Sequence, residues 1–422
     1  MPGPSDPIDA DRPVTVVAAS NGKHLFQGMR DPRLRLHPGP ASECADADLI
    51  VFPAGTIAHL DGLGAAEIPE PLQGRLAAGE VGVVLDASME GEEHTPERAA
   101  AMHETLRRWQ VSPLNCVYVT QDRNHRADYL AHCAATGLGP PVAVVNHDYW
   151  IWLVVQQFEG EGKRTYEALL AAFQARASRR ERRFMSLNLS PRPSKVLFLL
   201  SLLRDGHWDS GFISFGGFRP EDGQTSRPSA RRLKRHLPGF DDLIDELAPL
   251  IDALDSRGRQ LLGGDIDDWK TLKHASTRTK HLSEYGRSWF SVVTETEMRP
   301  RISRITEKPF KPLVNFHPVL MLGNPGALGM IRDLGFATFE EVFDESYDDE
   351  LDPRKRFDLV YREFERLCRL DEDELLRIER KIADKLIFNA RWGFTGLSAQ
   401  RRRQNDIRLM DDILAGVRRR PG

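Results

Sequence analysis

The sequence predicts an α/β protein with two domains, each a parallel β-sheet covered by helices. Short runs of apolar, largely β-branched residues recur along the chain, and segments long enough for a helix separate them. Several of these runs end directly in polar residues or glycines, as expected where a strand passes into a loop. At 422 residues the chain is too long for one compact core and fits two domains plus extensions.

Composition excludes several classes of protein. The 58 basic and 62 acidic residues nearly balance, so net charge predicts no binding to a polyanion. No apolar run approaches the roughly 18 residues of a membrane-spanning helix, and the first residues lack the pattern of a signal peptide. The four cysteines form no CxxC pair, so we expect reduced, mostly buried thiols in a cytoplasmic protein.

The first half of the chain predicts a Rossmann-like domain at residues 13–175, after a disordered segment at 1–12. Its expected strands are 14–19, 49–53, 81–86, 115–120 and 142–146. Short strands joined by crossovers form a parallel sheet. The absence of G-x-G-x-x-G after the first strand argues against a dinucleotide cofactor. The polar turn at 20–23 could contact a phosphate or an acceptor, although a plain β-to-α turn is the simpler interpretation.

The second half predicts another α/β domain at residues 176–352, followed by a helical extension at 353–422. The expected elements are strand 184–188, helix 196–203, strand 211–215, amphipathic helix 243–262, strand 289–293, helix 309–315 and strand 319–322. The last three form a β-α-β unit, whose polar residues fall where open α/β sheets bind ligands. Within a polar insertion at 219–236, the basic stretch 227–236 could bind an anionic acceptor such as a phosphorylated glycan, a lipid head group or a nucleic acid. It lacks the interleaved aromatics of a single-strand platform beyond His236, so a solvated surface is the simpler interpretation.

The tripeptide Thr306-Glu307-Lys308 supplies the groups that a sugar nucleotide needs. The Glu307 carboxylate can accept hydrogen bonds from ribose hydroxyls, and the Lys308 ammonium can meet a diphosphate. The first amides of the following helix also favour an anion. An alternative is purely structural, with Thr306 as an N-cap, Glu307 as a first-turn acid and Lys308 solvated.

The run TEKPFKPLVNFHPVLMLGNPG at 306–326 resembles the donor-binding segment of GT-B glycosyltransferases similar to the α-1,3-fucosyltransferases. It resembles more closely a group of bacterial and phage glycosyltransferase-like proteins with TEK-x-FKP, a GxPG strand end and an LGFxTF…DESYD tail. Here that tail lies at 334–339 and 344–348. The resemblance implies a GT-B-like fold, in which two Rossmann-like domains face each other across a cleft. It also implies C-terminal helices, of which 380–416 would pack back on the first domain.

The resemblance further implies an inverting, metal-independent transfer of a sugar, such as fucose or a similar deoxyhexose, from a nucleotide-diphosphate sugar to an unknown acceptor hydroxyl. Such a transfer needs a carboxylate base. The related proteins carry a similar D-x-S-x-EG loop, which points to Glu90 as the base with Asp86 as its neighbour. The alternative is a solvated acidic loop in which Asp86 caps the next helix.

The departing diphosphate needs cationic or dipolar help. Arg192 and Lys195 follow strand 184–188, where the related proteins carry N-x-x-x-R-x-H-R. Asn188 and Arg192 fit that pattern, but Ser194-Lys195 replaces the His-Arg pair and loses the bidentate fork of arginine. The remaining donor-binding residues that the resemblance implies are Thr306 with Glu307 and Lys308, Glu295 and Glu297 for the sugar hydroxyls, and Asn324 and Gly326 lining the donor pocket.

No metal or other cofactor is expected. Asp265 and Asp267 could share a divalent ion with a diphosphate, but an acid-rich helix start is the simpler interpretation. The expected partners are a nucleotide-sugar donor and a glycan, protein or small-molecule acceptor, without nucleic acid or a membrane span. The second functional hypothesis is a non-catalytic module that keeps the fold and binds a nucleotide or glycan.

Overall fold

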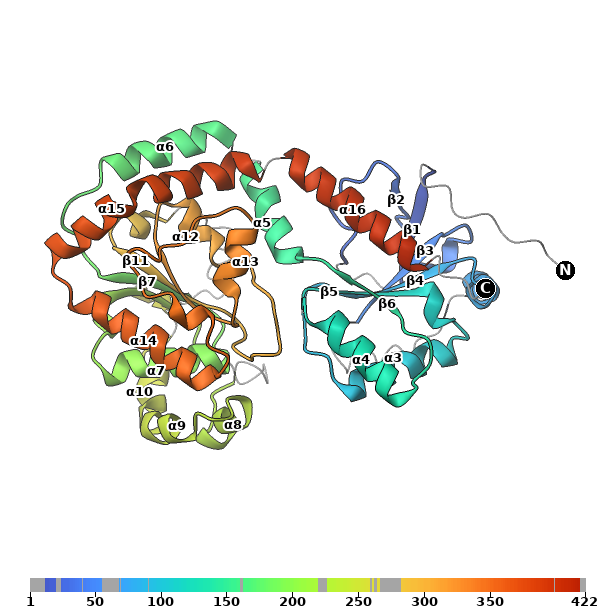
Figure 1. Cartoon of the computed structure of the whole chain (residues 1–422), viewed down its shortest axis with the longest axis horizontal. Coiled ribbons are helices and arrows are strands. Elements are labelled where there is room, and N and C mark those ends of the chain that lie inside the picture. The colour runs from blue at the N-terminus through green and yellow to red at the C-terminus, as the bar shows by residue number, and fades with distance from the viewer. Residues whose placement is uncertain are drawn as a thin grey trace. The chain divides into compact units, whose positions relative to one another are not determined.

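The structure is a computed structural model. It describes residues 12–19, 24–39, 41–54, 68, 70–89, 91–159, 162–218, 226–258, 260–261, 264–265, 282–397 and 399–417. The predictions for residues 1–11 and for the turn at 20–23 lie outside these residues. The chain forms two compact units, whose elements are labelled in Figure 1.

Unit 1 comprises Met1–Gln156, Arg301–Arg304 and Ser398–Gly422, and unit 2 comprises Gln157–Pro300 and Ile305–Leu397. These bounds differ from the expected domains at 13–175 and 176–352. The helices between 353 and 397 belong to unit 2 and do not form a separate extension, because their apolar faces pack on the core of that unit. Phe364, for example, meets Phe184 edge-on with ring centroids 4.9 Å apart.

Unit 1 is built on a six-stranded sheet in the order β2-β1-β3-β4-β5-β6, and all of its strand pairs are parallel. The strands are β1 (Val14–Ala18), β2 (Leu34–Leu36), β3 (Leu49–Pro53), β4 (Gly82–Ala87), β5 (Cys116–Thr120) and β6 (Ala143–Asn146). The five predicted strands are confirmed to within one residue at each end. The edge strand β2 was not predicted, because its three residues are largely exposed and carry no apolar run.

Helices cover both faces of this sheet. They are α2 (Glu70–Ala77), α3 (Pro96–Arg108), α4 (His125–Thr136), α5 (Tyr149–Glu159), which runs into unit 2, and α16 (Ala399–Val417). Figure 1 shows α16, in red, beside the strands of unit 1. Its residues Met410, Ile413 and Leu414 are buried in one cluster with Val84 and Val117. The expectation that a C-terminal helix packs on the first domain is therefore confirmed for 399–417, whereas 380–391 lies in a helix of unit 2.

Unit 2 contains a second six-stranded sheet, in the order β10-β9-β8-β7-β11-β12. The strands are β7 (Phe184–Asn188), β8 (Gly211–Phe215), β9 (Gln260–Leu261), β10 (Gly264–Asp265), β11 (Phe290–Thr294) and β12 (Val319–Leu322). The four strands β8, β7, β11 and β12 are parallel, and the short β9 and β10 add an antiparallel edge. The two sheets confirm the predicted α/β class with two Rossmann-like units.

The helices of unit 2 are α6 (Gly162–Gln174), α7 (Pro193–Arg204), α8 (Ala230–His236), α9 (Asp241–Leu247), α10 (Ile251–Ser256), α12 (Phe310–Val314), α13 (Ala327–Asp333), α14 (Pro353–Arg369) and α15 (Glu372–Arg391). The predicted β-α-β unit is confirmed as β11, α12 and β12. The single helix predicted at 243–262 is wrong. Pro249 lies in a 3₁₀ turn between α9 and α10, and Gly258 adopts a φ of +64° that ends the helical segment before β9.

The basic insertion is partly neutralised by neighbouring acids. Lys234 pairs with Asp245 at 2.7 Å, and Arg227 pairs with Asp252. All four cysteines are unpaired; Cys368 is half-buried and the other three are buried, as predicted. Within the described residues, no helix is long and apolar enough to cross a membrane.

Candidate functional site

The candidate site lies at the carboxyl ends of β7 and β11 in unit 2. The chain leaves β7 for β8 on one side of it and returns to β11 on the other, so the strand order reverses at this point. Open α/β sheets bind ligands at such a switch point, beyond the carboxyl ends of the strands. Of the predicted residues, Asn188 ends β7, Arg192 and Lys195 follow it, and Glu295 follows β11.

Asn188, at the end of β7, connects the central strands. It is fully buried, its amide nitrogen donates to Ser186 Oγ at 2.7 Å, and the Thr294 hydroxyl donates to its carbonyl oxygen. Its backbone N–H donates to Ser214 Oγ in β8 at 3.0 Å. Asn188 therefore holds three strand ends in register and positions the segment that follows β7.

Glu295, Thr306 and Lys308 form one connected group. Both carboxylate oxygens of Glu295 accept hydrogen bonds from the Thr306 hydroxyl, at 2.9 and 2.8 Å, and Oε1 also accepts from the Thr306 backbone N–H at 3.0 Å. The Lys308 ammonium lies 3.3 Å from Glu295 Oε2 and 2.8 Å from Thr306 Oγ1. Thr306 is not the N-cap of α12, since that position is Pro309. Through these contacts Glu295, which is 2% exposed, holds the loop at 306–308 in place.

Glu307 lies among lysines. Burial raises the pKa of the Glu307 carboxyl group, but the positive charges of Lys308, Lys311 and Lys195 together lower it by more. The pKa of Glu307 therefore falls below its usual range. Glu307 is half-buried and is ionised at neutral pH. A carboxylate in this state can accept hydrogen bonds from two neighbouring hydroxyls. Glu297, by contrast, accepts from the backbone N–H groups of Met298 and Arg299 and pairs with the Arg299 side chain at 2.8 Å.

Lys195 is the most unusual group of the site. It is 4% exposed, and no other described residue gives its ammonium a hydrogen bond or an ion pair. The pKa of Lys195 is lowered to about 7, mainly by burial and also by Lys308 and Arg192, while Glu295 and Glu307 partly oppose this fall. A buried ammonium without a partner costs free energy, and a bound anion would remove that cost.

The N-terminus of α7 adds further donors beside Lys195. Arg192 is the N-cap residue, Pro193 follows it, and the buried hydroxyl of Ser194 has no partner among the described residues. The first amides of a helix are free of intrahelical bonds and carry a partial positive charge. Together with two cationic side chains, they form a cradle suited to a phosphate or diphosphate.

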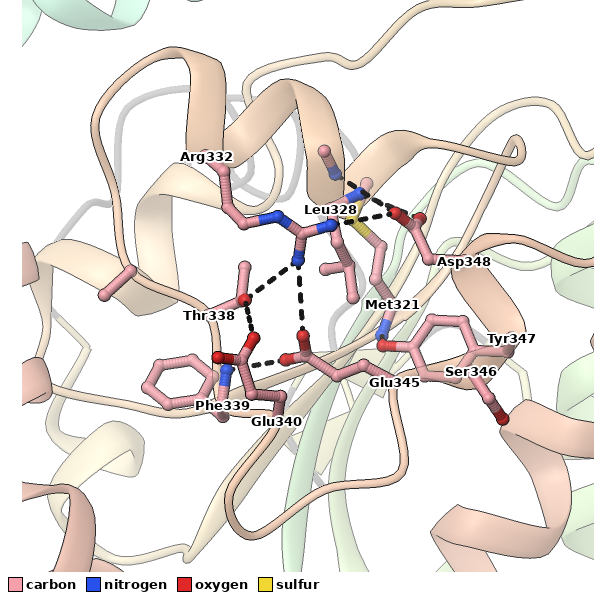
Figure 2. A network of polar contacts seen from close by, with 12 residues as sticks. Met321, Leu328, Arg332, Thr338, Phe339, Glu340, Glu345, Ser346, Tyr347 and Asp348 are labelled. Carbon is pink, nitrogen blue, oxygen red and sulfur yellow. Dashed lines mark hydrogen bonds and ion pairs between the residues drawn. The ribbon is translucent and has the colours of Figure 1, made fainter.

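Figure 2 shows the contacts that the DESYD segment makes with α13 and with β12. Asp348 accepts hydrogen bonds from the backbone N–H groups of Leu328 and Gly329, at 2.9 and 3.0 Å, at the start of α13. Arg332 points back toward Thr338 and Glu345, with contacts of 3.0 and 3.4 Å. The amides at the N-terminus of α13 therefore already bind a carboxylate of the protein, and the DESYD segment has a structural role.

The two predicted residues of the GNPG loop are also held internally. Gly326 has a φ of +73°, which favours glycine, and its N–H donates to the Asp348 carbonyl at 2.7 Å. The Asn324 amide nitrogen donates to the Arg299 carbonyl at 2.8 Å, while its buried Oδ1 has no partner among the described residues. Arg356 was not predicted as a residue of this region; it is 1% exposed and donates to the carbonyl groups of Gly323, Glu350 and Met298.

Of the two candidate carboxylates in unit 1, Glu90 lies outside the described residues. Asp86 is 5% exposed, and its two oxygens accept from the backbone N–H groups of Leu25, at 2.7 Å, and Ser88, at 2.9 Å. Burial is the main cause that raises the pKa of Asp86. Asp86 therefore binds backbone amides at the end of β4. It does not cap the next helix, α3, whose N-cap is Thr95.

The residues considered for a metal are only partly described. Asp267 lies outside the described residues, and only the backbone of Asp265 is described, as part of β10. Among the side chains that are described, no group of three or more His, Cys, Asp or Glu is arranged to hold a metal ion.

No protein-family model matches the chain, and neither a curated protein nor a solved structure shows detectable similarity to it. Function is therefore inferred from the geometry of the site and from the motif resemblance.

Proposed function

We propose that this chain is a glycosyltransferase of GT-B architecture, which moves a sugar from a nucleotide-diphosphate sugar to an acceptor hydroxyl. One observation carries the proposal: the side chain of Lys195, which is 4% exposed, lies at the N-terminus of α7 among the charges of Arg192, Glu307 and Lys308. A cationic cradle beside an ionised carboxylate matches a diphosphate joined to a ribose. The motif resemblance extends the proposal to fucose or a similar deoxyhexose as the sugar.

The proposed reaction is a single displacement. The acceptor oxygen bonds to the anomeric carbon as the bond to the diphosphate breaks, and a carboxylate takes the acceptor proton. Lys195, Arg192 and the α7 amides stabilise the charge that develops on the departing diphosphate. Glu307 binds the ribose hydroxyls, Lys308 adds a second cation, and Glu90 is the proposed base. None of these steps requires a metal ion.

Thermal shifts with GDP-, UDP-, dTDP- and CMP-sugars test donor binding. A donor at a hundredfold excess over its dissociation constant should stabilise the protein by about 2.7 kcal/mol. The CMP-sugar, which has a single phosphate, should give the smallest shift. Lys195→Met should abolish the shift with the diphosphate sugars, while Lys355→Met, at an exposed position on α14, should keep it. Lys308→Ala should also abolish it, with the apo protein still folded.

Equal shifts in wild type and Lys195→Met would overturn the donor site. The second hypothesis, a non-catalytic nucleotide- or glycan-binding module, predicts the same shifts but no turnover. Slow hydrolysis of the bound sugar nucleotide without acceptor distinguishes the two, because an enzyme should release free sugar and a binding module should not.

A further inference from the structure

Unit 1 contains a second group of buried polar atoms without partners. The side chain of Gln121 is 1% exposed, and neither its amide nitrogen nor its carbonyl oxygen has a hydrogen-bond partner among the described residues. The hydroxyl of Ser88, which is fully buried, makes no well-aligned hydrogen bond to a described residue, but it lies close enough to the Asp86 carboxylate to lower the pKa of that group. Native proteins rarely leave a buried carboxamide unsatisfied at both ends, because desolvation of its polar atoms is not compensated. Such a group indicates a bound ligand or ordered water.

The topology brings these two residues together. Ala87 of β4 is in register with Thr120 of β5, so Ser88 and Gln121 follow the carboxyl ends of neighbouring strands. The backbone of Gly91 lies against Gln121: an added Cβ there would come within 2.8 Å of the Gln121 Cβ and 3.0 Å of the Arg304 Cδ. Gly91 also has a φ of +53°. The turn that follows β4 is therefore packed on the Gln121 side chain without an intervening side chain.

Asp122 adds a carboxylate to this edge. Its Oδ1 accepts from the backbone N–H groups of Asn124, at 3.1 Å, and Ser303, at 2.9 Å, while Oδ2 has no partner among the described residues. Burial raises the pKa of Asp122 to about 6, and the nearby Arg304 guanidinium opposes that rise. The cluster thus offers hydrogen bonds without the excess positive charge of the site in unit 2.

Aromatic rings border the same edge after β6. The Trp150 indole N–H donates to the Met89 carbonyl at 2.8 Å, which joins the ring to the turn after β4. Tyr149 meets Trp150 edge-on with ring centroids 5.3 Å apart, and both residues are half-buried. Half-buried aromatic rings beside converging polar groups are typical of sites for small ligands with both apolar and polar faces.

We propose that Ser88, Gln121 and Asp122, with the rings of Tyr149 and Trp150, form a binding site for an uncharged carbohydrate. A carboxamide and a hydroxyl both donate and accept, and each sugar hydroxyl does the same, so their hydrogen-bonding capacities match. The Asp122 carboxylate can accept from a further hydroxyl but would repel an acidic sugar. The inference rests on the proposed function only for the role of this carbohydrate as the acceptor.

A matched pair of ligands tests the site: methyl β-glucoside and methyl β-glucuronide, which differ by one carboxylate. Saturation-transfer NMR and titration should show that the wild-type protein binds the glucoside and binds the glucuronide at least about tenfold more weakly. Gln121→Met, which keeps the side-chain length, and Ser88→Ala should each weaken glucoside binding by about tenfold or more, since each removes hydrogen bonds to the ligand. The exposed Gln174→Met in unit 2 should bind like wild type.

The site assignment is overturned if the glucoside fails to bind wild type, or if Gln121→Met and Ser88→Ala bind it unchanged. These outcomes are expected if only ordered water occupies the site. In that case the free energy of unfolding of Gln121→Met should exceed that of wild type. Equal binding of the glucuronide would overturn the assignment to uncharged ligands. If Gln121→Met does not fold, Ser88→Ala decides, because it removes a single atom. Thermal shifts with nucleotide sugars, measured on the same samples, report separately on the site in unit 2. Failure of the proposed function can therefore be distinguished from failure of the carbohydrate site in unit 1.

Discussion

The Lys308 ammonium lies 3.3 Å from Oε2 of Glu295, and this ion pair joins the loop before α12 to the end of β11. The side chains of Glu295 and Lys308 are 3% and 21% exposed. Lys195 reaches the same site without a comparable partner among the described residues. The two lysines of this site therefore differ: Lys308 is held in place by Glu295, and Lys195 has no comparable ion pair among the described residues.

The first prediction concerns the Glu295–Lys308 pair. Glu295→Ala removes a buried carboxylate and leaves the Thr306 hydroxyl and the Lys308 ammonium without their acceptor. We expect a loss of roughly 3 kcal/mol in the free energy of unfolding, the low end for a broken buried pair, measured by urea denaturation. Glu297→Ala is the matched control. Its partner Arg299 is 47% exposed, so the loss should be about 1 kcal/mol or less. Equal losses in the two variants would contradict the buried role of Glu295.

The second prediction is a pH dependence of nucleotide binding. The pKa of Lys195 is lowered from 10.5 to about 7, so the free protein loses the Lys195 proton above neutral pH, while the unfolded chain keeps it up to about pH 10.5. Burial of the charged ammonium therefore lowers the free energy of unfolding by its full amount below pH 7. This loss of stability becomes smaller as the pH rises above 7. Diphosphate binding requires the charged form. The dissociation constant should be constant well below pH 7 and rise above it, approaching about tenfold per pH unit.

Lys195→Arg tests this assignment, because arginine stays charged throughout the range. Its dissociation constant for the same nucleotide should vary little between pH 6 and pH 9. Isothermal titration at several pH values measures both proteins. A wild-type affinity that is flat over this range would show that Lys195 does not contact the diphosphate.

The third prediction separates Glu90 from Asp86. Glu90→Gln should lower turnover by about 10²–10⁴-fold with unchanged donor binding, the usual effect of losing a general base. Asp86→Asn should instead lower stability by about 1–3 kcal/mol, since an amide offers one oxygen where Leu25 and Ser88 each need an acceptor. If Glu90→Gln turns over like wild type and Asp86→Asn does not, Asp86 is the base. If neither affects turnover, unit 1 does not supply the base in this loop.

The fourth prediction concerns acid stability of unit 1. Burial, followed by His94 and Arg98, lowers the pKa of His125 to about 3. The unfolded chain takes up this proton below about pH 6.5 and the folded chain does not, so stability is lost as the pH falls through this window. One such group lowers the free energy of unfolding by about 2 kcal/mol between pH 6.5 and pH 5.

His125→Phe should lose less stability on acidification, while its ring can still stack on Tyr118, where the centroids are 4.8 Å apart. Urea midpoints of both proteins at pH 7 and pH 5 provide the comparison. His94 and His103 also have lowered pKa values, caused mainly by burial, so the variant should keep part of the pH dependence. An identical loss in the two proteins would rule out His125 as a source.

The fifth prediction is that glycosyl transfer persists in EDTA. The charge on the leaving diphosphate would be met by Lys195, Arg192 and the amides of α7, so no divalent ion is required for it. Initial rates with and without chelator should agree within experimental error. Loss of the rate in EDTA, with recovery on adding magnesium or manganese, would return Asp265 and Asp267 to consideration as ligands.

Much of the fold could be predicted because its signals are local. Strands such as β3, β7 and β8 are short apolar runs bounded by turn residues, and their predicted bounds match the structure. The prediction failed where the local signal was weak or mixed, at the exposed strand β2 and at the broken helix around Pro249. The positions of Arg192, Lys195 and the 306–308 loop at one edge of a sheet also followed from strand order and the motif resemblance.

The sequence by itself determined the α/β class, most strand positions and the residues gathered near the switch point of unit 2. Only the tertiary structure decided which of their polar groups are engaged. It placed Glu295 beside Lys308 and the Asp348 carboxylate at the start of α13, and it left both polar atoms of the Gln121 side chain without a hydrogen-bond partner among the described residues. The physical reason is that a strand depends on neighbouring residues in the chain. A hydrogen bond or ion pair between distant residues depends instead on which segments the tertiary fold brings into contact. Burial then sets the free energy of each polar group, and it too is absent from local sequence.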